Sequence, residues 1–200
     1  MGNLADSYQT VGRRDEALKL EAEQLTLRRR VLGPEHPDTL GTMISLANDY
    51  YAAGRPADAE PLYRESLEAI KQATPTHDFV VYLGALADTL RQQGRLTEAE
   101  PIYRAGLNFC RQFVVNDDGE HQWLACGLGA LLRSQKKWAE AEPFYREAVT
   151  NSAALWPNDF PKWQWQFNDL VDVLQHQGKT NEIERLKDTY LTGRRPVTAH

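Results

Sequence analysis

Apolar positions recur along this chain at helical spacing on both sides of a repeated turn. The segments that show this are SLANDYYAAGRPADAEPLYRESL, ALADTLRQQGRLTEAEPIYRAGL and GLGALLRSQKKWAEAEPFYREAV. A leucine and a bulky apolar residue lie four apart before the turn, and an alanine and a tyrosine lie four apart after it. Residues four apart share one face of a helix. Each segment therefore predicts two antiparallel helices joined at the turn.

The turn residue sets the register of five such units, because fainter copies precede and follow the three clear ones. The turn residues, spaced by 42, 40, 42 and 42 positions, are Gly12, Gly54, Gly94, Lys136 and Gly178. Glycine adopts positive φ easily, which suits a chain reversal. Lys136 therefore predicts a strained or different turn. Pro61, Pro101 and Pro143 must lie in or near the first turn of their helices, or kink them.

The predicted core consists of the positions that repeat around each turn. Eight residues before it stand Leu4, Leu46, Leu86, Leu128 and Leu170. Five residues after it stand Ala17, Ala59, Ala99, Ala141 and Ile183. Four residues later stand Tyr63, Tyr103 and Tyr145. The small residue after each leucine allows a neighbouring helix to approach closely.

These positions resemble the consensus of the tetratricopeptide repeat (TPR) family. The longer unit, with LGPEHPDTL at Leu32–Leu40, looks like the kinesin-light-chain subtype and is similar to the arrays of many bacterial proteins. The resemblance implies an all-α fold, a right-handed superhelical solenoid of five antiparallel helix pairs. The repeats would span about 1–33, 34–75, 76–116, 117–158 and 159–192, followed by a flexible tail at 193–200.

The two ends of the array depart from the repeat pattern. The last helix should present a polar outer face, since no repeat follows it. The residues that supply this face are Glu182, Glu184, Arg185, Lys187 and Asp188. Met1 lies eleven residues before Gly12, too few for a complete first helix. We therefore expect this chain to be the end of a longer array, or to follow more protein, and its N-terminal end could support self-association.

Composition narrows the class of partner. Hydrophobic residues make up 42% and charged residues 26% of the 200 residues, as in ordinary folded proteins. The net charge of −5 argues against a nucleic-acid partner. No apolar run approaches the ~20 residues of a membrane helix, and no secretory signal is visible, so no membrane partner is expected. Cys110 and Cys126, without CxxC spacing, suggest core residues in a reducing, cytoplasmic compartment.

No motif in the sequence indicates catalysis. The histidines lack metal-site spacing, and no phosphate-binding loop or GxSxG motif is present. Glu60, Glu100 and Glu142 recur at one repeat position, but on successive units, and a favourable interaction with the helix dipole explains them. The acidic segment 116–120 lacks the alternating carboxylates of a calcium loop. We predict no enzyme activity, no cofactor, no metal and no small-molecule substrate.

Five tryptophans concentrate in the C-terminal half of the chain. They are Trp123, Trp138, Trp156, Trp163 and Trp165. Core packing of repeats 4 and 5 explains them, since aromatic side chains dominate buried area. The alternative is an aromatic platform for a peptide.

The resemblance also implies a ligand groove, because the first helices of TPR units line a concave face. The implied groove residues are Asn48, Tyr51, Asp88, Arg91, Trp123, Arg133, Trp165, Asn168 and Asp172. Arg91 and Arg133 share a position in adjacent units, which implies a separation of roughly 10 Å. They would grip carboxylates of an extended peptide, or else pair with Asp88 or Asp172. The two asparagines would hydrogen-bond a peptide backbone.

The sequence thus predicts a protein–protein interaction scaffold that binds a protein or extended peptide on the concave face. The alternative is a C-terminal regulatory or docking segment of a larger bacterial enzyme, such as a Ser/Thr kinase. The incomplete first helix motivates this alternative.

Overall fold

The computed structural model describes residues 14–71, 77–113 and 119–192 of the chain. Regular structure in these ranges is helical, and no strand occurs within them, which confirms the expected all-α class. The predicted first helix of repeat 1, with Leu4 and Gly12, and the predicted tail at 193–200 lie outside the described residues. The chain forms two compact units, Met1–Val114 and Val115–His200.

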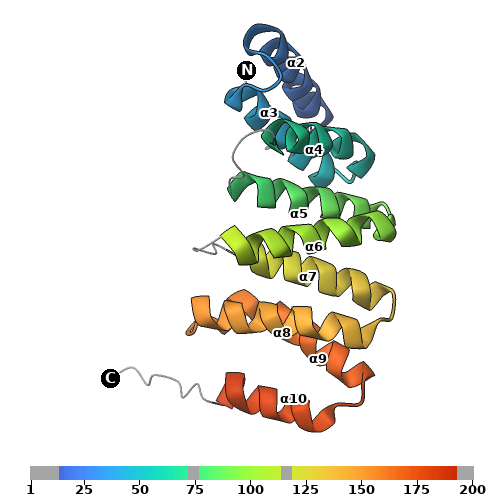
Figure 1. Cartoon of the computed structure of the whole chain (residues 1–200), viewed down its shortest axis with the longest axis vertical. Coiled ribbons are helices and arrows are strands. Elements are labelled where there is room, and N and C mark those ends of the chain that lie inside the picture. Colours follow the sequence, from blue (N-terminus) through green and yellow to red (C-terminus); the bar gives the residue numbers. More distant parts are fainter. Residues whose placement is uncertain (1–13, 72–76, 114–118, 193–200) are drawn as a thin grey trace. The chain divides into compact units, whose positions relative to one another are not determined.

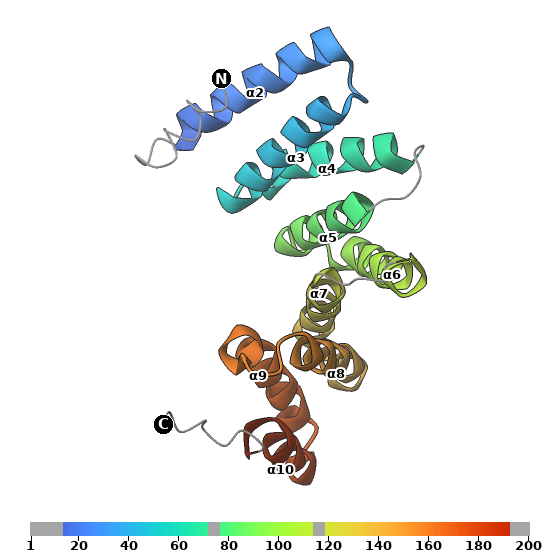
Figure 2. The ribbon, with the colours of Figure 1, turned by 90° about the vertical axis from the view of Figure 1, so that its left-hand side faces the viewer.

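Unit 1 consists of stacked helices in which each helix packs against the next. The helices are α2 (Arg14–Leu32), α3 (Pro37–Ala52), α4 (Pro56–Lys71), α5 (His77–Gln92) and α6 (Leu96–Phe113). The pairs α3/α4 and α5/α6 are antiparallel hairpins, which we call repeats 2 and 3 (Figures 1 and 2). Helix α2 packs against α3, and α4 against α5.

Unit 2 continues the same pattern with its own helices. They are α7 (Glu120–Ser134), α8 (Trp138–Leu155), α9 (Phe160–His176), α10 (Thr180–Lys187) and the π-helix η1 (Asp188–Thr192). The pair α7/α8 forms repeat 4, and α9 with α10 forms repeat 5 (Figure 1). Helix α9 also packs against α8.

The four described turns between paired helices share one backbone conformation. Gly54, Gly94 and Gly178 have φ of 72°, 77° and 71°, and Lys136 has φ of 60°. After each turn residue, the next N–H donates to the carbonyl five residues back, as in Arg95 N to Leu90 O (2.9 Å) and Lys137 N to Leu132 O (3.0 Å). This pattern is the Schellman motif that ends many helices. Lys136 therefore occupies a strained version of the same turn rather than a different one.

The predicted core positions are buried. The four leucines at the repeated position in repeats 2–5, the alanines after each turn, and all three repeated tyrosines are nearly inaccessible to solvent. Burial of each leucine side chain contributes about 1.5–3 kcal/mol. The repeated positions therefore form a continuous apolar spine within each unit.

The repeated prolines lie just beyond the first helical turn. Pro61, Pro101 and Pro143 are each the sixth residue of their helices, α4, α6 and α8. Proline there leaves one carbonyl of the preceding turn without its helical partner. All three prolines are exposed, so water can solvate that carbonyl and the helices continue.

An aromatic cluster closes the end of unit 2. Trp163 is fully buried, and its ring meets those of Phe160 and Tyr190 edge-on at centroid distances of 4.8 and 5.6 Å. Its indole N–H donates to Trp156 O (3.2 Å). Because η1 brings Tyr190 back to this cluster, the short helix α10 is sufficient to complete repeat 5. The expected packing role thus holds for Trp163.

Candidate binding face on the first helices

A recurring hydrogen-bond clamp joins the second helix of one repeat to the turn of the next repeat. Glu60 of α4 accepts from Gln93 Nε2 (3.0 Å) and Arg95 Nη1 (2.5 Å), which flank the next turn. Glu142 of α8 accepts from Gln177 Nε2 (2.8 Å) and Lys179 Nζ (2.5 Å) in the same way. The recurring glutamates therefore hold adjacent repeats together, beyond the helix-dipole effect that the sequence suggested.

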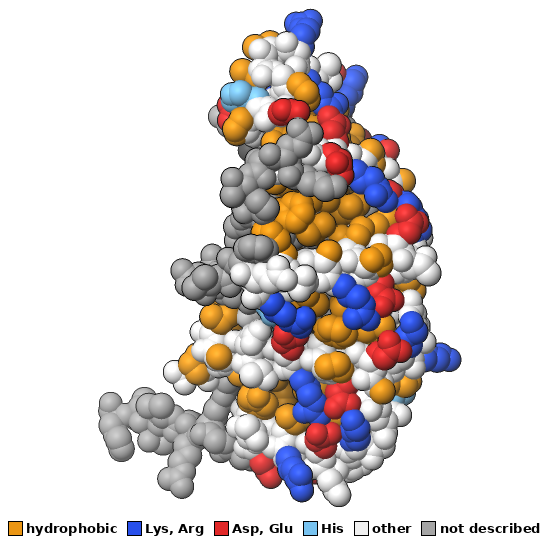
Figure 3. Space-filling model, in the orientation of Figure 1, with side chains coloured by type: hydrophobic (Ala, Val, Ile, Leu, Met, Phe, Trp, Pro, Cys, Tyr) orange, Lys and Arg blue, Asp and Glu red, His pale blue; other side chains and the backbone are white. Residues whose placement is uncertain are grey.

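The clamp stabilises these carboxylates in their charged form. Burial alone would raise the pKa of Glu60, but hydrogen bonds from Gln93 and Arg64, together with the charge of Arg95, lower it below its ordinary value. The pKa of Glu142 is lowered by the same balance, with Lys179 as the main opposing group. Acidic and basic side chains alternate over α4 and α6, and again over α8 and α10 (Figure 3). Several charged groups on these helices are paired within the chain, as Arg64 is with Glu60 and Arg146 with Glu142 and Glu182.

In repeat 3, Asp88 and Arg91 of α5 form a polar trio with Tyr103 of α6. The Tyr103 hydroxyl donates to Asp88 Oδ1, and Arg91 donates to the same oxygen from Nε (3.3 Å) and Nη2 (3.1 Å). Arg91 Nε also lies 3.3 Å from the Tyr103 oxygen. Asp88 is 9% exposed. The sequence predicted that Arg91 either binds a carboxylate of a peptide or pairs with Asp88. The structure shows the pairing with Asp88.

The electrostatics of this trio follow from its burial. Burial and the charge of Asp88 raise the pKa of Tyr103, so its hydroxyl stays protonated and donates. Burial alone would lower the pKa of Arg91, but Tyr103 and Asp88 raise it. Burial and Asp88 also raise the pKa of Tyr51, a half-buried groove candidate on α3. The preceding repeat has a simpler version, in which Tyr63 donates to Asn48 (2.5 Å).

Arg133, which occupies the same position in repeat 4 as Arg91 does in repeat 3, has different partners. Arg133 Nη1 donates to Asp169 Oδ1 (2.7 Å) and Asp172 Oδ2 (3.4 Å), both on α9 of the following repeat. The Arg133 guanidinium also lies over the Tyr145 ring, 5.8 Å from its centroid. Of the two possibilities predicted for Arg133, pairing with carboxylates of its own chain is again the one observed. Asp169, which the groove positions did not include, takes the shorter bond.

The remaining groove candidates differ in exposure. Trp165 on α9 is 51% exposed, and Asn48 and Asn168 are also exposed. Trp123 on α7 is half-buried and has interactions within the chain. His176 at the end of α9 stacks on Trp138, with ring centroids 4.0 Å apart. Of the two tryptophans among these candidates, Trp165 is therefore the more exposed.

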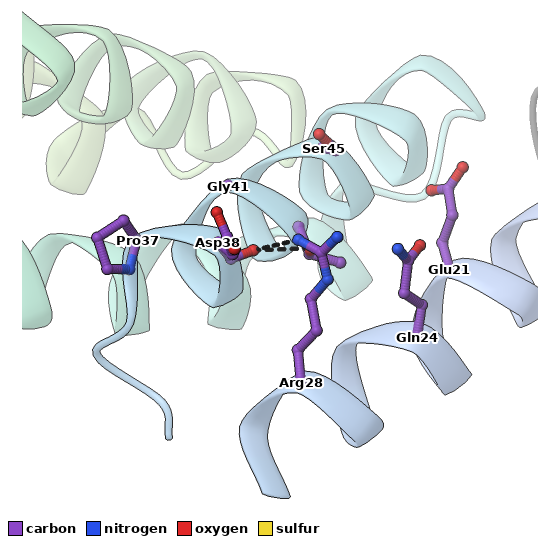
Figure 4. A pocket seen from close by; sticks show the side chains of 8 residues that line it. Glu21, Gln24, Arg28, Pro37, Asp38, Gly41 and Ser45 are labelled. Atoms are coloured by element: carbon purple, nitrogen blue, oxygen red, sulfur yellow. Dashed lines mark hydrogen bonds between the residues drawn. The ribbon is translucent and has the colours of Figure 1, made fainter. Parts of the chain in front are cut away.

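A hollow of about 350 Å³ lies beside the first helix of repeat 2. Gly41 and Ser45 line it from α3, and Glu21, Gln24 and Arg28 line it from α2 (Figure 4). Arg28 Nη1 donates to Asp38 O (2.7 Å) across one end of it. The hollow is polar, which suits a peptide backbone better than an apolar ligand.

The described part of the chain shows no group of three side chains able to hold a metal ion. His36 is the N-cap of α3, and its Nδ1 accepts a hydrogen bond from Asp38 N (3.1 Å). Among the described helices, none combines the length and apolarity needed to cross a bilayer. Most of the acidic segment at 116–120 lies outside the described residues.

Comparison with known proteins agrees with this helix arrangement. The family model described as tetratricopeptide repeat matches residues 1–72 and 78–154. No curated protein matches the sequence. The nearly identical TPR-like repeats assigned to a kinesin light chain of Podosopora anserina share 19% identity, with a TM-score of 0.76, over 94% of this chain and 90% of that one. BtubC (BKLC) of P. vanneervenii shares 22% identity, with a TM-score of 0.80, over 98% of this chain and 82% of that one.

Proposed function

Because the chain belongs to the tetratricopeptide repeat family, we propose that it is a protein–protein interaction scaffold whose first helices bind an extended peptide. These helices are α3 and α5 in unit 1 and α7 and α9 in unit 2. The fold of this family is generally a non-catalytic scaffold, and helical solenoids leave one side of their stacked hairpins available to partners.

The first and second helices of the repeats differ in their exposed side chains, and this difference supports the proposal. On the second helices, charged side chains are matched by the clamps at Glu60 and Glu142. The first helices instead carry the exposed side chains of Asn48, Asn168 and Trp165, and the hollow beside α3. An exposed aromatic side chain beside amide groups is typical of peptide-binding surfaces.

The proposal includes a reducing, cytoplasmic location. Neither Cys110 nor Cys126 forms a disulfide, and both are buried. Burial and the charge of Asp169 raise the pKa of Cys126, so it stays a protonated thiol and packs as a small apolar group.

Selection of a displayed random-peptide library on the full chain tests this function. The affinity of a selected peptide would be measured by fluorescence anisotropy against Asn48→Ala and Trp165→Ala, with Glu140→Ala on the exposed surface of α8 as the matched control. We expect at least one first-helix variant to weaken binding by about tenfold, or about 1.4 kcal/mol, and the control to leave it unchanged. Failure to select any peptide, or equal binding by all variants, would refute the proposal.

A further inference from the structure

Repeat 1 lacks the tyrosine that repeats 2–4 bury nine residues after the turn. The three repeated tyrosines are at most 1% exposed. The corresponding residue of repeat 1, nine residues after Gly12, is Glu21 on α2. Glu21 is 8% exposed, so a carboxylate side chain takes the buried place of an aromatic ring. It lines the hollow of about 350 Å³ beside α3 (Figure 4).

The facing wall of this hollow also has a small residue where other repeats have a large one. Gly41 on α3 stands thirteen residues before its turn, where the following repeats have Val81, Trp123 and Trp165. A water molecule takes about 30 Å³ in the liquid, so the hollow that results admits a whole side chain.

The fold itself does not require glycine at position 41. Gly41 lies inside α3 with a helical backbone, where glycine is less stable than alanine. A Cβ added to it would meet no atom of the described chain within 4 Å. Gly41 therefore weakens its helix without serving a turn or a close helix contact. Close approach of a ligand to the backbone is the remaining use of a glycine at such a place.

The side chains of α2 that line the hollow offer both hydrogen-bond donors and acceptors. Glu21, Gln24 and Arg28 are spaced by three and four residues, so they share the face of α2 that is turned to α3 (Figure 4). At one end, Arg28 Nη1 donates to the Asp38 carbonyl (2.7 Å). Gln24 is half-buried, and its side chain forms no hydrogen bond with the residues that the structure describes. Its carbonyl and its NH2 group are therefore available to a ligand.

The charges around Gln24 favour a neutral ligand. The carboxylates of Glu21 and Asp38 repel an acidic side chain, and the guanidinium of Arg28 repels a basic one. Either kind of charge would also lose hydration on entering the hollow. An apolar side chain would leave the Gln24 amide without partners. A primary amide carries one carbonyl and two N–H groups, so it can form two hydrogen bonds with the amide of Gln24.

We propose that this hollow is a subsite for the primary amide of a glutamine or asparagine side chain of the extended peptide, paired with Gln24 and packed against the Gly41 backbone. The subsite rests on the proposed function and specifies one residue of the ligand in unit 1. Ser45, which is exposed one helical turn beyond Gly41, offers a further hydroxyl to the bound amide. The side chain bound here is neutral, unlike the carboxylates that the sequence suggested for Arg91 and Arg133.

Four synthetic peptides test the chemistry of this ligand. They are the acetylated and amidated pentapeptides Ala-Ala-X-Ala-Ala, in which X is Gln, Leu, Glu or Lys. The readouts in the full chain are the backbone N–H resonance of Gly41 and the side-chain NH2 resonance of Gln24, each identified with a variant at its own position. We expect the Gln peptide to shift both resonances with saturation and to bind about tenfold more tightly than the other three, as two hydrogen bonds of ordinary strength imply.

Variants on both walls locate the subsite. Gly41→Leu fills the hollow from α3 and should weaken the Gln peptide about tenfold, yet raise the melting temperature, because leucine favours a helix and its Cβ has space. Gln24→Ala should weaken the Gln peptide to a similar extent. The matched controls on the exposed surface of α6, Ala105→Leu and Gln112→Ala, should leave binding unchanged. Circular dichroism of each variant establishes that it is folded.

A charge change on α2 tests why acidic side chains are rejected. Glu21→Gln removes the buried carboxylate and should tighten the Glu peptide about threefold. Glu23→Gln makes the same change at an exposed residue of the same helix, outside the hollow, and should have no effect. Equal effects of the two variants would show that the net charge of the chain, rather than the hollow, selects the ligand.

Each other outcome overturns a defined part of the proposal. Tightest binding of the Leu, Glu or Lys peptide would assign the hollow to another class of side chain. Absence of a shift with all four peptides, or Gln-peptide binding that is unchanged in Gly41→Leu, would remove the subsite. In each case a library peptide that loses affinity in Trp165→Ala would still support the scaffold, whereas failure to select any library peptide would refute the proposed function itself.

Discussion

Repeats 3 and 4 share an arginine three residues before the turn and a tyrosine nine residues after it, yet the two side chains behave differently. In repeat 3, Asp88 joins Arg91 and Tyr103 into a buried group within one hairpin. In repeat 4, Ala130 takes the place of that carboxylate, and both Arg133 and Tyr145 interact with Asp169 of the next repeat. One substituted position therefore decides whether the arginine and the tyrosine interact within their own hairpin or with the following repeat.

The largest expected contrast is between the carboxylates that pair with these arginines. Asp88→Ala leaves a buried hydroxyl and a half-buried guanidinium without their acceptor, which should lower the free energy of unfolding by about 1.5–3 kcal/mol. Asp172→Ala removes a long, exposed contact and should lower it by about 0–1 kcal/mol. Urea denaturation followed by circular dichroism measures both.

Asp88→Asn provides the control for this contrast. An amide oxygen at this position accepts from the repeated tyrosine in repeat 2, as Asn48 does. Asp88→Asn should therefore keep the tyrosine bond and lose less stability than Asp88→Ala. Equal losses for the alanine variants at Asp88 and Asp172 would contradict the expected difference between a buried and an exposed carboxylate.

A second contrast concerns the small residue that follows the repeated leucine, Ala87 in repeat 3 and Gly129 in repeat 4. A Cβ on Gly129 would lie 2.9 Å from Tyr145 Cε2, too close for the buried ring to stay in place. We expect Gly129→Ala to lower the free energy of unfolding by about 1–3 kcal/mol, despite the better helix propensity of alanine. Thermal unfolding would test this, and a stabilised variant would show that the Tyr145 ring moves freely.

The elements that the sequence predicted are those set by local chemistry. A leucine four residues before a bulky apolar residue and an alanine four residues before a tyrosine, together with a glycine at the turn, establish both helices and the register between them. The same information places Leu86 and Leu128 in the core. All of these residues lie within one repeat, so the sequence of a single repeat is enough to predict its helices and their register.

The interactions that the sequence missed link residues about 35 positions apart. The clamp of Glu142 with Gln177 and Lys179 depends on how adjacent hairpins stack, and only the recurring Gln-Gly-Arg and Gln-Gly-Lys turns hinted at it. Asp169 was missed for the same reason, because the groove positions came from family resemblance rather than from packing. Whether Arg133 faces a ligand or an aspartate depends on the rotamer, which periodicity does not determine.

The smallest expected contrast concerns the turns of the two repeats. Gly94 and Lys136 both adopt positive φ, at 77° and 60°, but only lysine carries a Cβ that disfavours this conformation. We expect Lys136→Gly to raise the free energy of unfolding by about 0.5–1 kcal/mol, since relief of strain exceeds the added entropy of the unfolded chain. Lys137→Gly makes the same charge change at φ of −84° and should give no gain. Urea denaturation of both variants separates backbone strain from charge, because a charge effect would stabilise the two equally, whereas strain stabilises only the variant at Lys136.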